Sequence, residues 1–416
     1  MKKIAVMLPV AYRGGSLRAA KSMAKAIALA ARQKNEAVQV VFSYVKNDIY
    51  DLHTDFNDLW EYGISLRETV WQVFNRETLI PTLPLLARAP ETLRHHSYCL
   101  PVDGANDFYD CDLWIIISDR LPAPLFPLRK HICVIYDYLQ RYVPEIFGGI
   151  GGAGSVWELQ EDSYFPLVRN AERVLVTTPS TRADMIAYAG VSGARISLIK
   201  MDFNPPEDVK STRDDLNLPS KYFIWTTNTA AHKNHINALN ALEKYFQDFS
   251  GEFDLVVTGV NSEYLDVERE FDKNDPMLGV PQIKFTREKI SASQSLRERI
   301  HILGNVSEKV YASVLRKSLF LWHPNKYDNG TFSVIEAAYF QNPSLSARYP
   351  AMEYINQKFN LNLSFFDPHN TRDMAETLFA MEKNYIKVTL PEREILLQKS
   401  WQASAPALYD IISEFL

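Results

Sequence analysis

The amino-terminal segment of the chain has the pattern of a strand, a glycine loop and a helix in direct succession. Residues 4–10 form a continuous apolar run of strand length, and Arg13-Gly14-Gly15-Ser16 opens a helical pattern that continues to Ala31. A second apolar run, residues 38–44, follows. Such a βαβ unit requires a parallel sheet with helices over its faces, so we expect an α/β protein.

The same alternation continues and then begins again after a polar interruption. Residues 206–218 belong to the polar, proline-bearing stretch FNPPEDVKSTRDDLNLP, which lacks apolar periodicity and is typical of a linker. For a chain of 416 residues we therefore expect two domains, 1–205 and 219–392, and a helical tail, 393–416, that packs back toward the first. Further strands are expected at residues 113–118, 132–136, 173–177, 222–226, 253–260, 300–303, 319–323 and 343–346.

Composition excludes several classes of protein. Hydrophobic residues make up 46% and charged residues 23%, which is typical of a compact soluble protein. The formal charge of -5 argues against a nucleic-acid partner. Three cysteines without a metal-ligand spacing favour a reducing compartment, and the run at 4–10 is too short to span a membrane, so we expect a cytoplasmic location. The charged stretch 263–295 is interpreted as an insertion with a surface helix.

Ligands of parallel sheets bind beyond the carboxyl ends of the strands, so the residues that follow each strand are the candidates. Gly14 and Gly15 allow close backbone approach, and the next helix offers free N–H groups to an anion, although a tight turn explains the pair equally well. The glycine loop after the first strand lacks the full GxGxxG pattern, which disfavours a dinucleotide oxidoreductase. Lys233 precedes a helix at 236–245, where it is either a clamp for a departing phosphate or an ordinary surface lysine.

The segment 323–338 carries the most specific pattern. A strand ends at His323, a loop containing Gly330 follows, and a helix begins near Phe332, which leaves Asp328 in the loop and Glu336 on the helix. Carboxylates accept hydrogen bonds from sugar hydroxyls, whereas the alternative interpretation is a loop acid and a solvated glutamate. Glu336 lies in an apolar stretch where an unpaired acid is costly, and this favours a functional role.

Residues 299–355, which include HPNKYDNGTFSVIEAAYFQNP, resemble the donor domain of family 4 glycosyltransferases with the GT-B fold. The usual pattern there is a strand ending in PS, followed by EGFGLPxLEAMACGxPVVAS. WTTNTAAHKNH resembles the phosphate-binding stretch TxEPRKN of the same family, and VIYDYLQRYVPEIF and RNAERVLVTTPSTRADMIAYAGV resemble two segments of its first domain. The resemblance implies two Rossmann-like domains with parallel sheets facing a central cleft.

It also implies retaining transfer of a hexosyl group from a nucleotide sugar to a glycan or lipid-linked glycan, in bacterial surface polysaccharide or lipopolysaccharide synthesis, without cofactor or metal. The implied roles are catalysis for Asp328, Lys233 and Asp137, the last on the acceptor side, and donor binding for Gly14, Gly15, His232, Lys233, Asn329, Gly330, Thr331, Phe332 and Glu336. Within this set Lys233 binds the diphosphate and Glu336 the ribose hydroxyls. The chain departs from the family at Asp328, which replaces a glutamate, and at His232, Tyr136 and Gln341.

Three questions stay open at this stage. Residues 79–88, with Arg94, His95 and His96, either touch a bilayer at the inner face of the cell membrane or form a buried helix. A GT-B sugar-nucleotide epimerase would share the donor site, and a catalytically degraded member would only bind a nucleotide or a glycan. The donor sugar cannot be copied from the family, because Asp328 is one methylene shorter than the usual acid.

Overall fold

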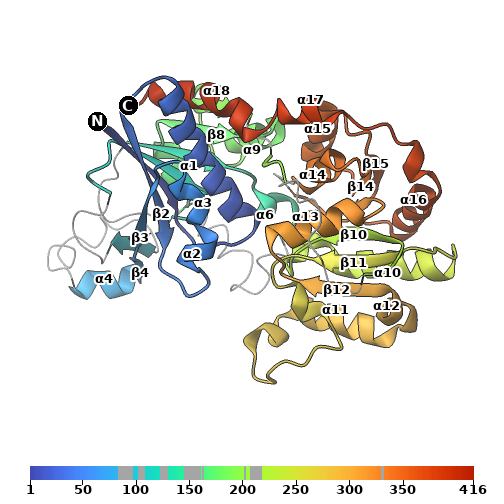
Figure 1. Cartoon of the computed structure of the whole chain (residues 1–416). Coiled ribbons are helices and arrows are strands. Elements are labelled where there is room, and N and C mark those ends of the chain that lie inside the picture. The colour runs from blue at the N-terminus through green and yellow to red at the C-terminus, as the bar shows by residue number, and fades with distance from the viewer. Residues whose placement is uncertain are drawn as a thin grey trace. The chain divides into compact units, whose positions relative to one another are not determined.

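The computed structural model describes residues 1–82, 97–101, 108–121, 130–144, 161, 164–200, 203–206, 218–328 and 332–416. They form two compact units, each with its own parallel sheet (Figure 1). Unit 1 comprises residues 1–138, 147–202 and 399–416, and unit 2 comprises 139–146 and 203–398. The expected tail therefore divides, because α17 (Arg393–Leu397) groups with unit 2 and α18 (Trp401–Ser413) with unit 1.

Unit 1 is built on a seven-stranded sheet in the order β3-β2-β1-β6-β7-β8-β9, in which every neighbouring pair is parallel. An antiparallel pair, β4 and β5, stands apart from it. The strands are β1 Lys2–Leu8, β2 Val38–Val45, β3 Ser65–Thr69, β4 Trp71–Asn75, β5 Ser97–Pro101, β6 Leu113–Ile117, β7 His131–Ile135, β8 Arg173–Val176 and β9 Ile196–Leu198. The helices are α1 Gly15–Gln33, α2 Leu52–Asp55, α3 Asn57–Trp60, α4 Arg76–Thr82, α8 Phe165–Asn170, α9 Pro179–Ala187 and η4 Gly193–Arg195.

Both faces of this sheet are covered, which is why its central strands are continuous apolar runs. Along β1, Ile4 and Val6 join the core beneath α1 and α18, whereas Ala5 and Met7 join a second core beneath α8 and α9. Helix α18 lies against α1, so the carboxyl terminus completes the first face (Figure 1).

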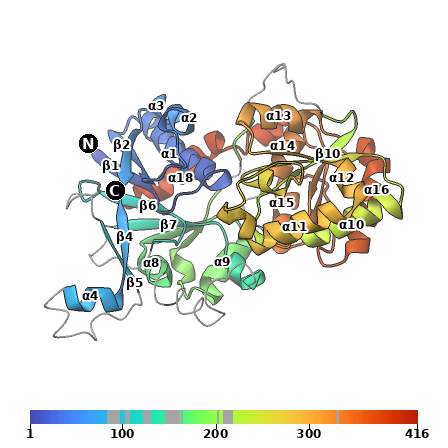
Figure 2. The ribbon, with the colours of Figure 1, turned by 90° about the horizontal axis from the view of Figure 1, so that it is seen from below.

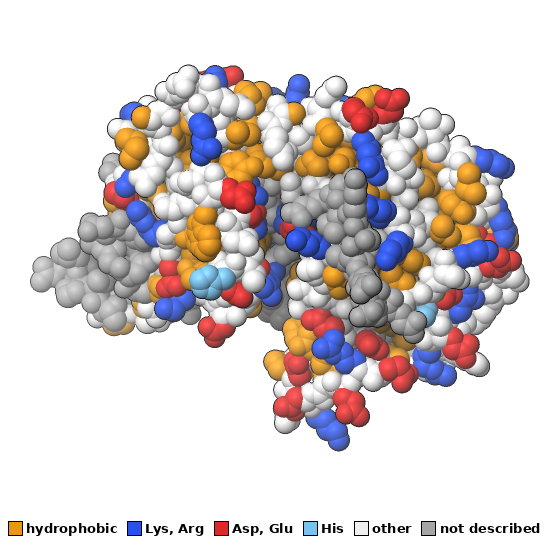
Figure 3. All heavy atoms as spheres, in the orientation of Figure 1, with side chains coloured by type: hydrophobic (Ala, Val, Ile, Leu, Met, Phe, Trp, Pro, Cys, Tyr) orange, Lys and Arg blue, Asp and Glu red, His pale blue; other side chains and the backbone are white. Residues whose placement is uncertain are grey.

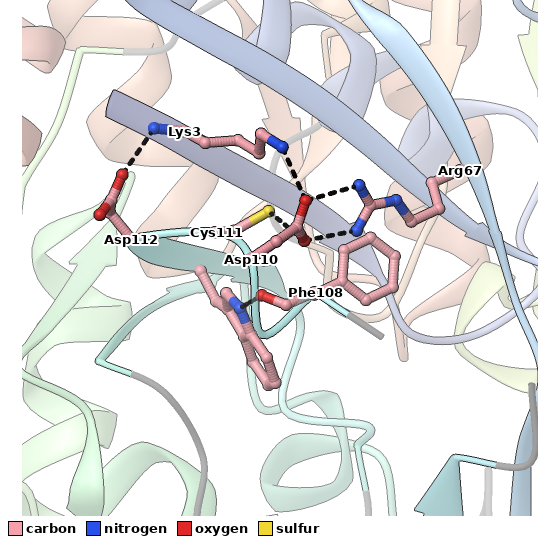
Figure 4. Close-up of polar contacts among 7 residues, drawn as sticks. Lys3, Arg67, Phe108, Asp110, Cys111 and Asp112 are labelled. Carbon is pink, nitrogen blue, oxygen red and sulfur yellow. Dashed lines mark hydrogen bonds and ion pairs between the residues drawn. The ribbon is translucent and has the colours of Figure 1, made fainter. Parts of the chain in front are cut away.

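The turn that leads into β6 is attached to strands β1 and β3 by an exposed ion cluster (Figure 4). Asp110 accepts hydrogen bonds from Lys3 Nζ at 2.7 Å and from both terminal nitrogens of Arg67, at 2.8 and 3.1 Å. These cations hold the pKa of the Asp110 carboxyl well below its ordinary value, the Arg67 hydrogen bonds being the largest cause. The Arg67 guanidinium also lies over the Phe108 ring.

Unit 2 contains a six-stranded parallel sheet in the order β12-β11-β10-β13-β14-β15. Numbered within the unit, this is the doubly wound order 3-2-1-4-5-6. Its strands are β10 Tyr222–Thr226, β11 Asp254–Thr258, β12 Ile300–Gly304, β13 Leu321–His323, β14 Ser344–Ala347 and β15 Ser364–Phe366. Its helices, besides α17, are α6 Leu139–Tyr142, η5 Ala231–Lys233, α10 His235–Gln247, η6 Ser262–Leu265, η7 Pro276–Gly279, α11 Pro281–Ala292, α12 Gln294–Arg299, α13 Glu308–Lys317, α14 Ser333–Tyr339, α15 Pro350–Phe359, α16 Thr371–Asn384 and η8 Tyr385–Lys387.

Helices cover both sides of this second sheet as well. Figure 2 shows α13 and α14 on one side and α10 and α11 on the other, and α10 also packs against α12 and α16. In the insertion, α11 buries Ile283 and Ile290 and is thus half in the core. The part of the insertion before α11 carries many charged side chains on the face drawn in Figure 3.

The α/β class, the two parallel sheets and the buried strands are as the sequence predicted. Three sheet-edge or outer strands were missed, β3, β9 and β15, and so was the β4–β5 pair. The sequence SLRET of β3 shows the reason. A strand at the edge of a sheet is partly exposed to solvent, so it lacks the continuous apolar run that marks a central strand. Most of the segment 79–88, for which contact with a bilayer was considered, lies outside the described residues, and so do Arg94, His95 and His96. Leu79 itself is buried.

Candidate functional site

The strand order of unit 2 reverses between β10 and β13, and open α/β sheets bind ligands beyond the carboxyl ends of the strands at such a reversal. The two segments that leave these strands are residues 227–234 and 324–328. Backbone N–H of Lys326 donates to the carbonyl of His232 at 2.8 Å, so the segments are hydrogen-bonded to each other. This carboxyl edge is where unit 2 is expected to hold a ligand.

Asn234 fixes the first of these segments. It has a left-handed backbone conformation, φ 65°, directly between η5 and α10. Its buried amide donates to the carbonyls of Pro324 at 3.0 Å and Pro368 at 2.8 Å. Lys233, the preceding residue, is therefore held at the end of β13.

Lys233 and Asp328 form an ion pair at this edge. Lys233 Nζ lies 2.5 Å from Asp328 Oδ2, and the side chains are 13% and 14% exposed. Asn325, which is buried, donates its Nδ2 to the same oxygen at 2.7 Å. Burial is the largest single influence and acts to raise the pKa of Asp328, but the charge and hydrogen bond of Lys233, together with His232 and His323, hold that pKa below the ordinary value. Asp328 is thus an ionised carboxylate at neutral pH.

His232 is not a second cation in this site. Burial is the main cause that lowers its pKa to about 4, and the neighbouring charge of Lys233 lowers it further. His235 and His323 are likewise buried, and their pKa values fall to about 3. All three rings are therefore neutral at neutral pH, so a donor-binding role for His232 would use an uncharged ring.

Glu336 is buried on the first turn of α14, as its apolar sequence context predicted. Its Oε2 accepts a hydrogen bond from the Tyr311 hydroxyl at 2.7 Å, and Tyr311 comes from α13. Phe332 lies at the start of α14, and its carbonyl accepts from the backbone N–H of Glu336. Asn329, Gly330 and Thr331 fall outside the described residues. Sequence reasoning missed Tyr311 and Asn325, because no spacing rule marks either residue.

Unit 1 has its own reversal of strand order, between β1 and β6. Gly14 precedes α1 with φ 67° and ψ -134°, a conformation that favours glycine, whereas a Cβ on Gly15 would meet open space. Because the residue that precedes α1 is a glycine, it has no side chain to cap the first N–H groups of this helix. Asp137 follows β7 and is partly exposed.

Asp119 and Arg120 follow β6 and were not among the predicted residues. Asp119 is buried, with Oδ1 3.5 Å from Arg120 Nε, and burial is the main cause that raises its pKa. The preceding Ser118 has a left-handed φ of 84°. Gly14 and Lys233 were predicted because each follows an apolar run of strand length. Asp119 and Arg120 also follow such a run, but the prediction did not include them.

The described residues contain no group of three or more His, Cys, Asp or Glu side chains placed to hold a metal ion. Nor does any helix among them have the length and apolarity to cross a membrane.

Three solved structures resemble the chain over nearly its whole length. Sucrose-phosphate synthase from Thermosynechococcus elongatus has a TM-score of 0.62 and 16% identity, and the match covers 100% of this chain and 99% of that one. Alr3699/HepE from Anabaena, in complex with UDP and glucose, has 0.61 and 14%, with 100% and 99% covered. WaaG, a glycosyltransferase involved in lipopolysaccharide biosynthesis, has 0.55 and 12%, with 99% and 95% covered.

The chain has the GT-B fold. This confirms the fold that the sequence resemblance implied. At these identities the likeness concerns the fold alone. No protein-family model matches the chain, and no curated protein matches it in sequence. The GT-B fold and the Lys233–Asp328 pair are thus the two independent observations on which a function can be built.

Proposed function

We propose that the chain is a retaining glycosyltransferase that moves a hexosyl group from a nucleotide-sugar donor to a glycan or lipid-linked glycan. The Lys233–Asp328 pair at the strand reversal of unit 2 carries the proposal, because it sets a cation for a diphosphate beside an acid for sugar hydroxyls. The UDP and glucose held by HepE, which shares the fold, support a nucleotide donor.

In the proposed reaction the bond between the anomeric carbon and the diphosphate oxygen breaks while the acceptor oxygen bonds to that carbon on the same face. The leaving diphosphate takes the acceptor proton. Lys233 would neutralise the charge that develops on the diphosphate, where a preorganised cation is most effective. Glu336 would accept hydrogen bonds from the ribose hydroxyls, and Asp328 from the transferred sugar. Residues 329–332 would supply backbone N–H groups. No metal or cofactor is required in this scheme.

The acceptor side is assigned to unit 1 on the resemblance of its sequence, with Asp137 as the proposed acceptor contact, and Gly14 and Gly15 would lie near the donor diphosphate. The proposed setting is bacterial surface polysaccharide or lipopolysaccharide synthesis, in the cytoplasm or at the inner face of the cell membrane. WaaG, which has the same fold, supports the lipopolysaccharide setting.

A panel of nucleotide sugars and nucleoside diphosphates, screened for thermal stabilisation of the purified chain, tests the donor first. We expect stabilisation by one nucleotide series, followed by transfer to a glycan acceptor with retention of the anomeric configuration and without loss of activity in EDTA. Conversion of the donor in the absence of any acceptor would instead identify an epimerase. Binding of nucleotide with no turnover of any donor would identify a degraded member of the fold.

A further inference from the structure

Two donors share a single oxygen of Asp328. Lys233 Nζ and Asn325 Nδ2 approach Oδ2 at 2.5 and 2.7 Å, from the segments that follow β10 and β13 respectively. Lys233 is charged and has a long, rotatable side chain, whereas Asn325 is neutral and fully buried. The two donors therefore differ in how readily a ligand can draw them away from the carboxylate.

A diphosphate at this edge would compete with Asp328 for Lys233. Lys233 faces His232, His323 and Asp328, and both histidines are neutral above about pH 4. A bound diphosphate, which carries more negative charge than a carboxylate, would attract the ammonium group away from Asp328. Asp328 would then lose its ion pair in the donor complex, where it has to hold its position against the sugar.

Asn325 cannot be drawn away in the same manner. Because Nδ2 donates to Asp328, its amide orientation is fixed and Oδ1 points elsewhere. That Oδ1 is buried and has no hydrogen-bond partner among the described residues. An unsatisfied buried oxygen costs stability, so the hydrogen bond to Asp328 is the interaction among the described residues that favours an asparagine at this position. What Asn325 does provide is a neutral donor for one carboxylate.

We propose that Asn325 is a positioning residue that keeps the Asp328 carboxylate in place, and ionised, after the donor diphosphate has taken Lys233 from it. The inference rests on the proposed function. It adds to that function a residue that acts through Asp328 and does not touch the nucleotide.

The test compares Asn325→Ala with Asn342→Ala in the full chain. Asn342 is the matched control, a buried asparagine of the same unit whose amide donates to Leu315 O and Ser318 Oγ. We measure kcat, the KM for the donor, the dissociation constant of the nucleoside diphosphate, and the pH dependence of kcat. Asn325→Asp, a nearly isosteric change that replaces the amide donor by a second acid, is the companion variant in case the alanine variant folds poorly.

In Asn325→Ala we expect kcat to fall roughly 10- to 100-fold, the size of a lost hydrogen bond to a charged group. Nucleoside diphosphate affinity should change by no more than about threefold. A hydrogen bond to the carboxylate favours its charged form, so its loss should raise the pKa of Asp328 and move the acid limb of the kcat profile to higher pH. Asn325→Asp should lose at least as much kcat, and Asn342→Ala should keep both kcat and the profile.

An unchanged kcat and pH profile in Asn325→Ala would overturn the inference. So would a fall in nucleoside diphosphate affinity that accounts for the whole loss, or an equal loss in Asn342→Ala. Each of these results leaves the proposed function standing, provided that the wild-type chain transfers sugar. If the wild-type chain neither binds a nucleoside diphosphate nor transfers sugar, it is the proposed function that fails, and the inference fails with it.

Discussion

Asp328 in unit 2 and Asp110 in unit 1 are two aspartates with similar partners. Each accepts hydrogen bonds from a lysine and from a second nitrogen-bearing side chain, Asn325 for Asp328 and Arg67 for Asp110, and in each case the lysine helps to hold the pKa of the acid below its ordinary value. Asp110 is 40% exposed in the turn before β6, beside the amino end of β1 (Figure 4). Asp328 is 14% exposed and lies at the carboxyl end of β13, where the strand order reverses.

The difference shows that the position in the topology, and not the ion pair itself, marks a functional candidate. An exposed pair is screened by water and salt and contributes little to stability, which suits a cluster that merely attaches a turn. The Lys233–Asp328 pair is more buried and so costs more to desolvate, and it lies at the edge where open α/β sheets hold their ligands, which favours a functional role. The predictions below separate the two clusters by activity and by stability.

The largest expected effect separates the two lysines. Lys233→Ala should lower kcat/KM for the donor by about 100- to 1,000-fold, because a charge placed against the developing diphosphate is lost. Lys3→Ala, at Asp110, should change it by less than about twofold, since that cluster lies at the opposite ends of the strands. Steady-state kinetics with the donor found in the screen measures both. Activity of Lys233→Ala at the wild-type level would refute the proposed clamp.

A second pair of variants tests the nucleotide anchor. Glu336 and Glu382 are both buried acids that accept a tyrosine hydroxyl, from Tyr311 and Tyr245 respectively. Glu336→Gln keeps the shape but weakens the acceptor, so the donor KM should rise by about 10-fold. Glu382→Gln should leave KM unchanged and lower stability alone. Equal KM values in all three proteins would mean that Glu336 serves the packing of α13 on α14 and nothing else.

Much of the fold and part of this site can be predicted from the sequence, and the limit is physical. Strands buried on both faces, such as β6, are apolar at every position, whereas β3 pairs on only one side and contains a single apolar residue, Leu66. Lys233 and Asp328 are visible because each follows a recognisable strand. The contact between Lys233 and Asp328 is not visible in the sequence. The two residues are 95 positions apart, and they meet only because β10 and β13 are neighbours in the sheet. Asn325 and Tyr311 are recognised only from their contacts in the fold, Asn325 with Asp328 and Tyr311 with Glu336.

Removal of the Asp328 charge should have opposite effects on binding and on turnover. In Asp328→Asn the competitor for Lys233 is gone, so the nucleoside diphosphate should bind about 3- to 10-fold more tightly. Transfer should nevertheless fall, because the sugar loses its charged acceptor. Calorimetry and a transfer assay on the same preparation measure the two quantities. Weaker nucleotide binding would show that Asp328 supports Lys233 and does not compete with the phosphate.

The smallest effect is expected at Asp110. Asp110→Asn should cost about 0 to 1 kcal/mol of unfolding free energy at pH 7, since the cluster is exposed, and should leave transfer unchanged. The pKa of Asp110 is lower in the folded chain than in the unfolded chain, so its contribution is present above the ordinary aspartate range and disappears as the pH falls. The difference between the variant and the wild type should therefore begin to shrink below about pH 4 and continue to shrink as the pH falls toward the lower folded-state pKa. Denaturant unfolding across that range measures it, and a loss of transfer in this variant would remove the distinction between the two edges.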